Sequence, residues 1–416
     1  MNRDRIVRTY MSLAGLYTLA ASLIWGVNTL FLLDAGLNLT EVFVANALFS
    51  VGMVAFEIPT GVVADTLGRR VSYLLSVGIL AATTALYLIA AQANAGVVVF
   101  GAISVVMGLG FTFFSGALEA WLVDALASVS SDDRLDHIFA RAGQMSGSAM
   151  FVGTITGGLL GQVDLALPFI ARSILLVAVF GLAHRLMQEI GFEPQELHIR
   201  EIPSAMRRQA QVGIAYGWNH TGLRLLMLSG AIRGVFFGWA FYAAQPYFLD
   251  LLDRDAVWVV GFVAAGVSLA TIAGNQIVDV VSRLCGRRST LLLWASGISA
   301  AAAITIGATS NFSVALAGLL TVAVAMGVVS PVRQSYLHQV TDSRYRATVV
   351  SFDAMIGSVG GAGGQVGLGA IADQRSLSAG YIVGGSVTAL AIPMLLLVRR
   401  FGGDADHFAT AEQTDV

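Results

Sequence analysis

The sequence consists largely of apolar runs of about 20 residues or more, separated by short segments that hold most of its charges. A helix of about 20 apolar residues is long enough to cross the roughly 30 Å of hydrocarbon in a bilayer. Only 12% of the 416 residues are charged, against about 25% in soluble domains, and the mean hydropathy is +0.75. The chain has too little polar surface for a soluble fold, so we expect an all-α polytopic membrane protein.

Charge and turn signals divide the chain into twelve candidate transmembrane helices, on either side of one long polar segment. The first six are expected at Tyr10–Leu33, Leu39–Val63, Val71–Ala91, Val97–Leu122, Ile138–Leu160 and Leu165–Met187. The second six are expected at Leu223–Leu249, Ala256–Val281, Ser289–Ala308, Phe312–Leu337, Ala347–Ile371 and Leu377–Val398. We therefore expect two six-helix bundles, residues 1–190 and 223–401, a linker at 191–222 with an amphipathic helix, and a tail at 402–416.

The arginines predict the orientation in the membrane. Most lie in or beside the segments that share a side with the N-terminus, and only Arg254 and Arg375 fall in segments on the other side. Because cytoplasmic loops carry the excess of basic residues, both termini are expected in the cytoplasm of a multi-pass cell-membrane protein.

Several classes of chemistry are excluded by what the sequence lacks. The 24 basic residues are all arginine, which rules out lysine nucleophiles and the phosphate-binding lysine of a Walker A loop. One cysteine, Cys285, cannot form an intramolecular disulfide or a cysteine-based metal site. No block of basic residues suggests nucleic acid. We expect no metal and no cofactor.

The two halves of the chain repeat each other. Gly68-Arg69-Arg70 recurs as Gly286-Arg287-Arg288, and the same offset along the chain separates Asp124 from Asp342. The segment 158–164 at the end of the fifth expected span resembles 367–373 at the end of the eleventh. Repeated six-span halves are typical of transporters whose substrate path runs between two bundles.

The segment from Gly61 to Arg70, GVVADTLGRR, lies between the second and third expected spans. It resembles the G-x-x-x-D-x-x-G-R-[RK] signature of the major facilitator superfamily, which occupies the same loop. A degraded copy, Gly274 to Asp279 followed by Gly286-Arg287-Arg288, stands in the equivalent loop of the second half. The resemblance covers essentially the whole chain and implies the twelve-span fold of that superfamily.

The residues of this motif have a physical interpretation. Gly61 permits close helix approach, Gly68 allows a sharp reversal, and Asp65 can accept from a neighbouring helix N-terminus. Arginines at these positions can pair with Asp124 in the first half and Asp342 in the second. In the family such a cluster latches the cytoplasmic side, and the resemblance implies this role for Gly61, Asp65, Gly68, Arg69, Arg70, Asp124, Asp279, Arg287, Arg288 and Asp342. The alternative is that these arginines only set the topology.

Two glycine-rich segments allow more than one interpretation. The stretch from Gly153 to Gln162 resembles the G-x-x-x-G-P-x-x-G-G pattern of antiporters in the superfamily, with Gly158 in place of the proline and Gln162 in place of the last glycine. Small residues at this spacing also allow tight helix packing whatever is transported. The eleventh expected span is glycine-rich too, which suits either a flexible gating helix or a closely packed one.

Ionisable groups inside spans are costly and are therefore candidates for function. Asp353 is the deepest acid, followed by Glu119 and Glu57, and these three are our candidates for proton coupling. The alternative places them with Arg333 in a cytoplasmic ion-pair network. Arg233, the deepest cation, could bind an anionic substrate or keep Asp353 ionised, and a role in the substrate cavity is favoured.

Uncharged polar and aromatic residues extend the set of substrate-cavity candidates. Beside Arg233 they are Asn28, Trp25, Gln144, Gln245, Tyr242 and Gln365. Such amides form interhelical hydrogen bonds as often as they contact ligands, and aromatic side chains near span ends commonly anchor a helix at the interface.

These observations predict a secondary active transporter that works by alternating access, is not an enzyme and uses the proton gradient. The first expectation, by resemblance to the drug:proton antiporter branch, is efflux of a drug-like or hydrophobic small molecule. The alternative is an importer or symporter of a sugar or organic acid. The expected partners are a small-molecule substrate and the lipid bilayer, for a monomeric protein. A membrane-embedded acyltransferase would need a His-x4-Asp pair, and His338 and Asp342 are one residue too close.

Overall fold

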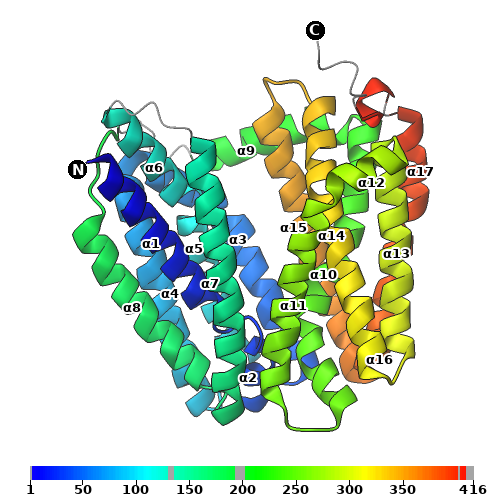
Figure 1. The fold of residues 1–416 in the computed structure, drawn as a ribbon, viewed down its shortest axis with the longest axis horizontal. Coiled ribbons are helices and arrows are strands. Elements are labelled where there is room, and N and C mark those ends of the chain that lie inside the picture. Colours follow the sequence, from blue (N-terminus) through cyan, green and yellow to red (C-terminus); the bar gives the residue numbers. More distant parts are fainter. Residues whose placement is uncertain (1, 130–134, 193–201, 402, 409–416) are drawn as a thin grey trace. The chain divides into compact units, whose positions relative to one another are not determined.

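The computed structural model describes residues 2–129, 135–192, 202–401 and 403–408, and within these ranges it contains helices and no strand (Figure 1). The contacts divide the chain into two compact units. Unit 1 comprises residues 1–205 and 253–265, and unit 2 comprises residues 206–252 and 266–416. The boundaries fall inside α9 Ile202–Val212, at the end of α10 Thr221–Leu252 and inside α11 Val257–Gln276. Parts of the expected linker, 193–201, and of the expected tail, 402 and 409–416, lie outside the described residues.

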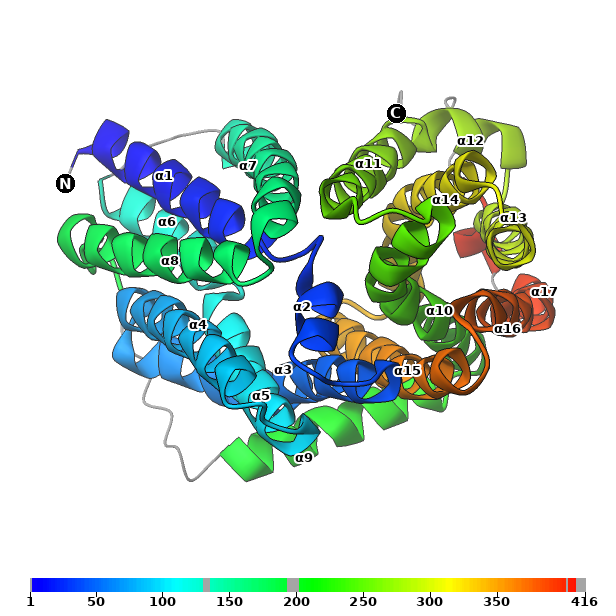
Figure 2. The same ribbon diagram turned by 90° about the horizontal axis from the view of Figure 1, so that it is seen from below.

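Unit 1 contains the first eight helices and the beginning of α11. The eight are α1 Arg3–Ser22, α2 Asn28–Asp34, α3 Leu39–Leu67, α4 Arg69–Gln92, α5 Val97–Phe114, α6 Ala117–Ser128, α7 Leu135–Val163 and α8 Leu167–Leu186. In Figure 2, α3 runs beside α5, and α4 lies between α5 and α8. Asn38 begins α3 with a capping box, because its side chain accepts from the backbone N–H of Glu41 while the Glu41 carboxylate accepts from that of Asn38.

Unit 2 contains the remaining elements, apart from the beginnings of α9 and α11. They are α9 Ile202–Val212, the π-helical segment η2 Gly213–Trp218, α10 Thr221–Leu252, α11 Val257–Gln276, α12 Val278–Cys285, α13 Arg288–Ala308, α14 Phe312–Val340, α15 Arg346–Gln374, α16 Leu377–Ala389, α17 Ala391–Phe401 and the 3-10 segment η3 Gly403–Asp406. Asn311 caps α14 and Ser376 caps α16, each accepting from a backbone N–H in the first turn.

Nine helices in the described part of the chain are long and apolar enough to cross a membrane. The expected spans Tyr10–Leu33, Ile138–Leu160 and Ala347–Ile371 lie on helices that do not reach this level of length and hydropathy. The charged start of α1 and the polar and glycine residues of α7 and α15 lower their hydropathy. Twelve spans with cytoplasmic termini therefore stay a prediction.

Several spans expected to be continuous are broken. The first divides into α1 and α2 at a turn over residues 23–27, the fourth divides where Gly116 adopts φ +73°, and the eighth divides at Ile277. Backbone groups freed by a break need partners in a low-dielectric setting. In the first break, the N–H of Asn28 donates to the carbonyl of Ile24 at 2.9 Å, so the chain supplies a partner itself.

Glycines bring α10 and α15 of unit 2 into backbone contact. A Cβ atom at Gly364 would lie 2.0 Å from the carbonyl oxygen of Val235, and one at Gly360 would lie 2.3 Å from that of Ala231. Neither distance can be tolerated, because backbone atoms cannot swing aside. Of the two interpretations of this glycine-rich segment, close packing accounts for these positions.

Glycines of α7 serve the same purpose in unit 1. A Cβ atom at Gly157 would lie 1.8 Å from the carbonyl oxygen of Leu23, and one at Gly158 would lie 2.8 Å from the Cα of Gly261, at the start of α11 in the same unit. The glycines of the antiporter-like stretch are thus packing positions, and antiport stays a prediction.

The glycine contact between α10 and α15 predicts a position-specific loss of stability. Gly364→Ala should lower the melting temperature of the purified protein by the equivalent of about 1–3 kcal/mol, because the added methyl group meets the Val235 carbonyl. The matched control is Gly363→Ala, because a Cβ there has no atom within 4 Å. Both variants gain the same helix preference, so equal melting temperatures for the two would contradict the close contact.

Candidate functional site

A cavity of about 400 Å³ lies within unit 2, among residues of α10, α13, α14, α15 and α16. Small-molecule sites typically measure about 300–1,000 Å³. The charged residues of its lining are Arg233, Arg333 and Asp353. The uncharged lining combines the polar side chains of Ser299, Ser330, Gln334 and Thr388 with the apolar ones of Phe236, Phe237 and Met326. The cavity can therefore hold a small molecule with both a charged and an apolar part.

Arg333 and Asp353 form a bidentate ion pair in this cavity. Nη1 of Arg333 donates to Oδ2 of Asp353 at 2.8 Å, and Nη2 donates to Oδ1. Asp353 is only 7% exposed. Two parallel N–H···O bonds between ionised groups are among the strongest polar contacts in proteins. Removing one partner of a buried pair of this kind costs about 3–5 kcal/mol.

Gly230 of α10 makes room for this pair. A Cβ atom at Gly230 would lie 2.4 Å from Nη2 of Arg333, the nitrogen that donates to Asp353. The guanidinium can therefore lie against the backbone of α10, where Nη2 also approaches the Leu226 carbonyl at 3.5 Å. Three helices, α10, α14 and α15, together determine where the pair lies.

Arg233 lies one turn beyond Gly230 on α10 and lines the same cavity. Among the described residues, no carboxylate is within ion-pair distance of it. A charged side chain in the middle of a span costs about 2.5–3.5 kcal/mol on insertion scales. With Asp353 ionised and paired, the lining carries one more positive charge than negative.

The other two proton-coupling candidates lie elsewhere. Glu57 on α3 and Glu119 on α6 are exposed, and neither forms an ion pair with any described residue. Of the ion-pair network considered from the sequence, the structure contains the Arg333–Asp353 contact alone among the described side chains.

Most of the substrate-cavity candidates do not line this cavity. Asn28 donates to Oδ1 of Asn46 at 3.1 Å and Gln365 donates to the Gly238 carbonyl at 3.2 Å, so both form interhelical hydrogen bonds. The remaining candidates are Trp25 in the turn between α1 and α2, exposed Gln144 on α7, and Tyr242 and buried Gln245 on α10. Arg233 is the candidate that the structure brings together with Asp353.

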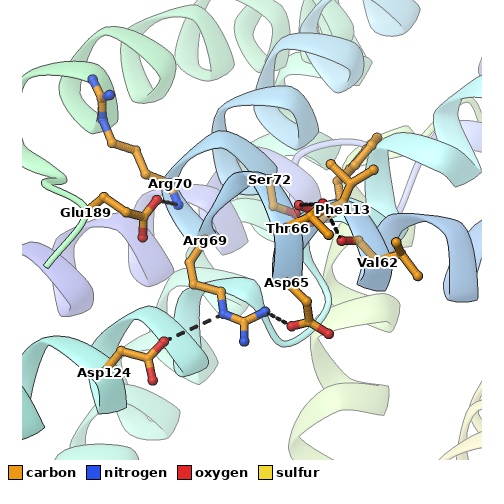
Figure 3. A network of polar contacts seen from close by, with 10 residues as sticks. Val62, Asp65, Thr66, Arg69, Arg70, Ser72, Phe113, Asp124 and Glu189 are labelled. Atoms are coloured by element: carbon orange, nitrogen blue, oxygen red, sulfur yellow. Dashed lines mark hydrogen bonds and ion pairs between the residues drawn. The ribbon is translucent and has the colours of Figure 1, made fainter. Parts of the chain in front are cut away.

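The first-half motif forms a charged cluster at one end of unit 1, which we call the unit 1 end cluster. Arg69 forms an ion pair with Asp65, and its Nε lies 3.7 Å from Oδ2 of Asp124 (Figure 3). Arg70 does not pair with Asp124 as expected. Its Nη2 donates instead to the His184 carbonyl at 2.9 Å. A Cβ at Gly61 would have open space within 4 Å, so its expected role in close helix approach finds no contact here.

Glu189, which follows α8, completes this cluster and was not expected. Its Oε2 accepts from the backbone N–H of Arg70 at 2.9 Å, at the N-terminus of α4 (Figure 3). Gly68 has φ +107°, and a Cβ there would lie 2.4 Å from the same oxygen. The backbone conformation thus favours glycine at 68, and the absence of a side chain leaves room for the carboxylate. Burial raises the pKa of Glu189, against the lowering effect of the hydrogen bonds from the backbone of Arg70 and Arg69.

The second copy of the motif forms a different cluster, the unit 2 end cluster, with the chain beyond α17. Asp406 is 1% exposed and accepts from both the backbone N–H (2.8 Å) and the hydroxyl (2.7 Å) of Ser289. Nη1 of Arg288 donates to the Ala405 carbonyl at 2.7 Å and to that of His407. The guanidinium of Arg288 also lies over the ring of Phe408, 4.8 Å from its centroid. Residues 403–408 therefore hold the N-terminus of α13.

The pairing expected between these arginines and Asp342 is wrong. Asp342 accepts from the backbone N–H of Arg344 at 2.9 Å, in the turn before α15, and Arg287 pairs through its backbone with His407. Asp279 lies in the first turn of α12 and has no ion-pair partner among the described residues. Arg288 instead donates to backbone carbonyls of the tail, and the Asp406 carboxylate accepts from Ser289.

Comparison with known proteins shows a weak sequence similarity and a fold similarity to transporters. No family model matches the sequence. An uncharacterised MFS-type transporter of Bacillus subtilis, YxaM, is 22% identical over 175 residues. This match covers 42% of the present chain and 41% of that relative, so the chain matches about two fifths of the relative's length.

Solved structures cover nearly the whole chain. The POT family transporter PepTSo has a TM-score of 0.70 at 13% identity, covering 98% of this chain and 100% of that one. The nucleoside transporter NupG has a TM-score of 0.70 at 12% identity, with 96% and 100% covered. The human organic anion transporter MFSD10 has a TM-score of 0.61 at 16% identity, with 95% and 100% covered. The chain has the major facilitator fold.

In this major facilitator fold, each half caps a helix N-terminus with an acidic side chain, and the acidic residue differs between the halves. Glu189 follows the last helix of the first half and caps α4, and Asp406 follows the last helix of the second half and caps α13. The sequence contained a signal for this. Glu189 follows Gly68, and Asp406 follows Gly286, at nearly the same distance along the chain. The two positions hold different acids, so a comparison for identical residues does not match them.

The cap in unit 2 predicts that the tail stabilises this unit. Asp406→Ala should lower the melting temperature by the equivalent of about 1–2 kcal/mol, because it leaves a helix N-terminus without its cap and a buried Ser289 hydroxyl without its acceptor. Asp34→Ala, which removes an exposed carboxylate, is the control. A melting temperature equal to that of the control would contradict the role assigned to the tail.

Proposed function

We propose that the chain is a secondary transporter that moves a small organic solute across a membrane by alternating access, with Asp353 as its proton-coupling residue. The observation that carries this proposal is the Arg333–Asp353 ion pair, which joins α14 to α15 and lines a cavity of about 400 Å³. The major facilitator fold supports it, as does the match to an MFS-type transporter.

The chemistry of coupling follows from the pair. A carboxylate next to an arginine favours its ionised form, and a proton on it cancels that attraction. When Asp353 takes up a proton, the bidentate contact is lost and Arg333 becomes available to another acceptor. Asp353 can therefore act as a switch whose state depends on the proton and on what else occupies the cavity.

The lining of the cavity favours one of the two substrate classes expected from the sequence. Three charged side chains face the space, which suits a polar or charged solute better than a purely hydrophobic compound. The structural neighbours named above include a nucleoside transporter and an organic anion transporter. We therefore place proton-linked transport of an organic acid ahead of drug efflux.

The coupling role predicts the behaviour of one variant. In proteoliposomes with a pH-sensitive dye inside, a panel of carboxylates, nucleosides and dipeptides should contain solutes that move protons through the wild-type protein. Asp353→Asn should abolish this proton movement, because its amide cannot carry a proton between the two sides, while exchange of the same labelled solute continues.

The controls for this experiment are Glu57→Gln and Glu119→Gln, which alter the two exposed acids and should keep coupling. Undiminished proton movement in Asp353→Asn would overturn the assignment of Asp353. Absence of solute movement with every class of the panel in the wild type would argue against transport itself.

We also propose that the unit 1 end cluster is a cytoplasmic latch, as the family resemblance implies. Asp65→Asn should reduce the rate of solute exchange several-fold without lowering the amount of protein inserted in the membrane, because Arg69 loses one of its two ion-pair partners. The matched control is Asp255→Asn, at an exposed acid. Exchange at the wild-type rate in Asp65→Asn would refute the latch.

A further inference from the structure

We infer that the unit 2 cavity is a binding site for a small organic monocarboxylate, with Arg233 as its primary ligand and Arg333 as a second ligand that becomes free when Asp353 is protonated. This inference deepens the proposed transport function and rests on it for its physiological meaning. The binding itself can be measured without transport. It stands on the arrangement of three charged groups around one cavity.

The charge of the lining is the first step. The titratable and charged groups that face Asp353 across the cavity are Arg233 from α10 and Arg333 from α14, while α13 and α16 contribute the hydroxyls of Ser299 and Thr388. Asp353 balances one arginine. Arg233 has no carboxylate partner among the described residues, so the site lacks one negative charge.

The shape of the ligand is the second step. A guanidinium is planar and binds carboxylates through two parallel hydrogen bonds, as Arg333 already does with Asp353. Arg233 can present the same donors to a carboxylate in the cavity. Phe236, Phe237 and Met326 line the remaining space and suit the apolar body of an organic acid rather than a free inorganic anion.

The link to the proton is the third step. A proton from water forms an O–H bond on one carboxylate oxygen of Asp353, and the ion pair with Arg333 opens. Two arginines then face the cavity without a counter-charge. A carboxylate ligand neutralises one of these two positive charges, and both guanidinium groups can donate hydrogen bonds to it. Proton and carboxylate therefore favour each other's binding, and they would be carried together.

The test is a binding experiment on the full chain in lipid nanodiscs. The probes are acetate, hexanoate and benzoate, each compared with its neutral amide of the same shape, and binding is followed by calorimetry in two buffers of different ionisation enthalpy. We expect at least one carboxylate to bind at least tenfold more tightly than its amide, with uptake of a proton from the buffer.

Two variants test the roles of Arg233 and Asp353 in carboxylate binding. Arg233→Gln should weaken carboxylate binding at least tenfold while the melting temperature stays near that of Arg254→Gln, a control at an exposed arginine. If Arg233→Gln fails to fold, Arg233→Lys keeps the charge and should retain measurable binding with a smaller loss. Asp353→Asn should still bind the carboxylate but without proton uptake.

The outcomes separate this inference from the proposed function. Equal affinity for all three carboxylates and their amides, or unchanged affinity in Arg233→Gln, would overturn the carboxylate site even if the protein transports another solute. Carboxylate binding without proton uptake would overturn the link to Asp353 and leave the site at Arg233 in place. Binding as expected together with failed solute exchange in proteoliposomes would contradict transport and support the site.

Discussion

The Arg333–Asp353 ion pair is the interaction around which the unit 2 cavity is arranged, because a buried charge is costly unless an opposite charge offsets it. The pair draws on three helices at once. Arg333 comes from α14, Asp353 from α15, and Gly230 of α10 leaves the space for the guanidinium. The glycine contacts between α10 and α15 hold those two backbones together, so the position of the pair follows from backbone packing. Arg233 then lies in the same cavity without a carboxylate partner among the described residues, and the excess positive charge is the property that a ligand would neutralise.

Both halves secure the start of a helix with a carboxylate from far along the chain. In unit 1 Glu189 caps α4 beside the Arg69 ion pairs, and in unit 2 Asp406 caps α13 beside Arg288. Gly68 and Gly286 precede these helices, and both have positive φ. The two halves therefore repeat a geometry, in which the acid is Glu from the segment after α8 in one half and Asp from the tail in the other. This cap ties the end of each half back to its third expected span.

The helical membrane class and part of the candidate site were predictable from the sequence, and particular residues show why the rest was not. Apolar runs identified the helical membrane class because hydrocarbon leaves few alternatives, and the spacing around Asp65 and Arg69 located the unit 1 end cluster. The depth of Asp353 and Arg233 in apolar runs singled out two of the three charged residues that line the cavity. The breaks at residues 23–27 and at Ile277 were missed, because hydropathy does not change across them. The contacts of Arg288 with the carbonyls of Ala405 and His407 were missed, since a tail of mixed composition gives no sign that it packs against α13. Asn28 and Gln365 could not be separated from true cavity residues, because an interhelical hydrogen bond and a ligand contact need the same side chain.

The central claim is that Asp353 changes its protonation state when the cavity is occupied. Infrared difference spectroscopy measures this directly, because a protonated carboxyl group has a C=O stretching band that a carboxylate lacks. Addition of the tightest-binding carboxylate probe to the wild-type protein should produce a positive band in this region, and the band should be absent in Asp353→Asn and present in Glu57→Gln and Glu119→Gln. A band that persists in Asp353→Asn, or no band in the wild type with the probe bound, would contradict the account.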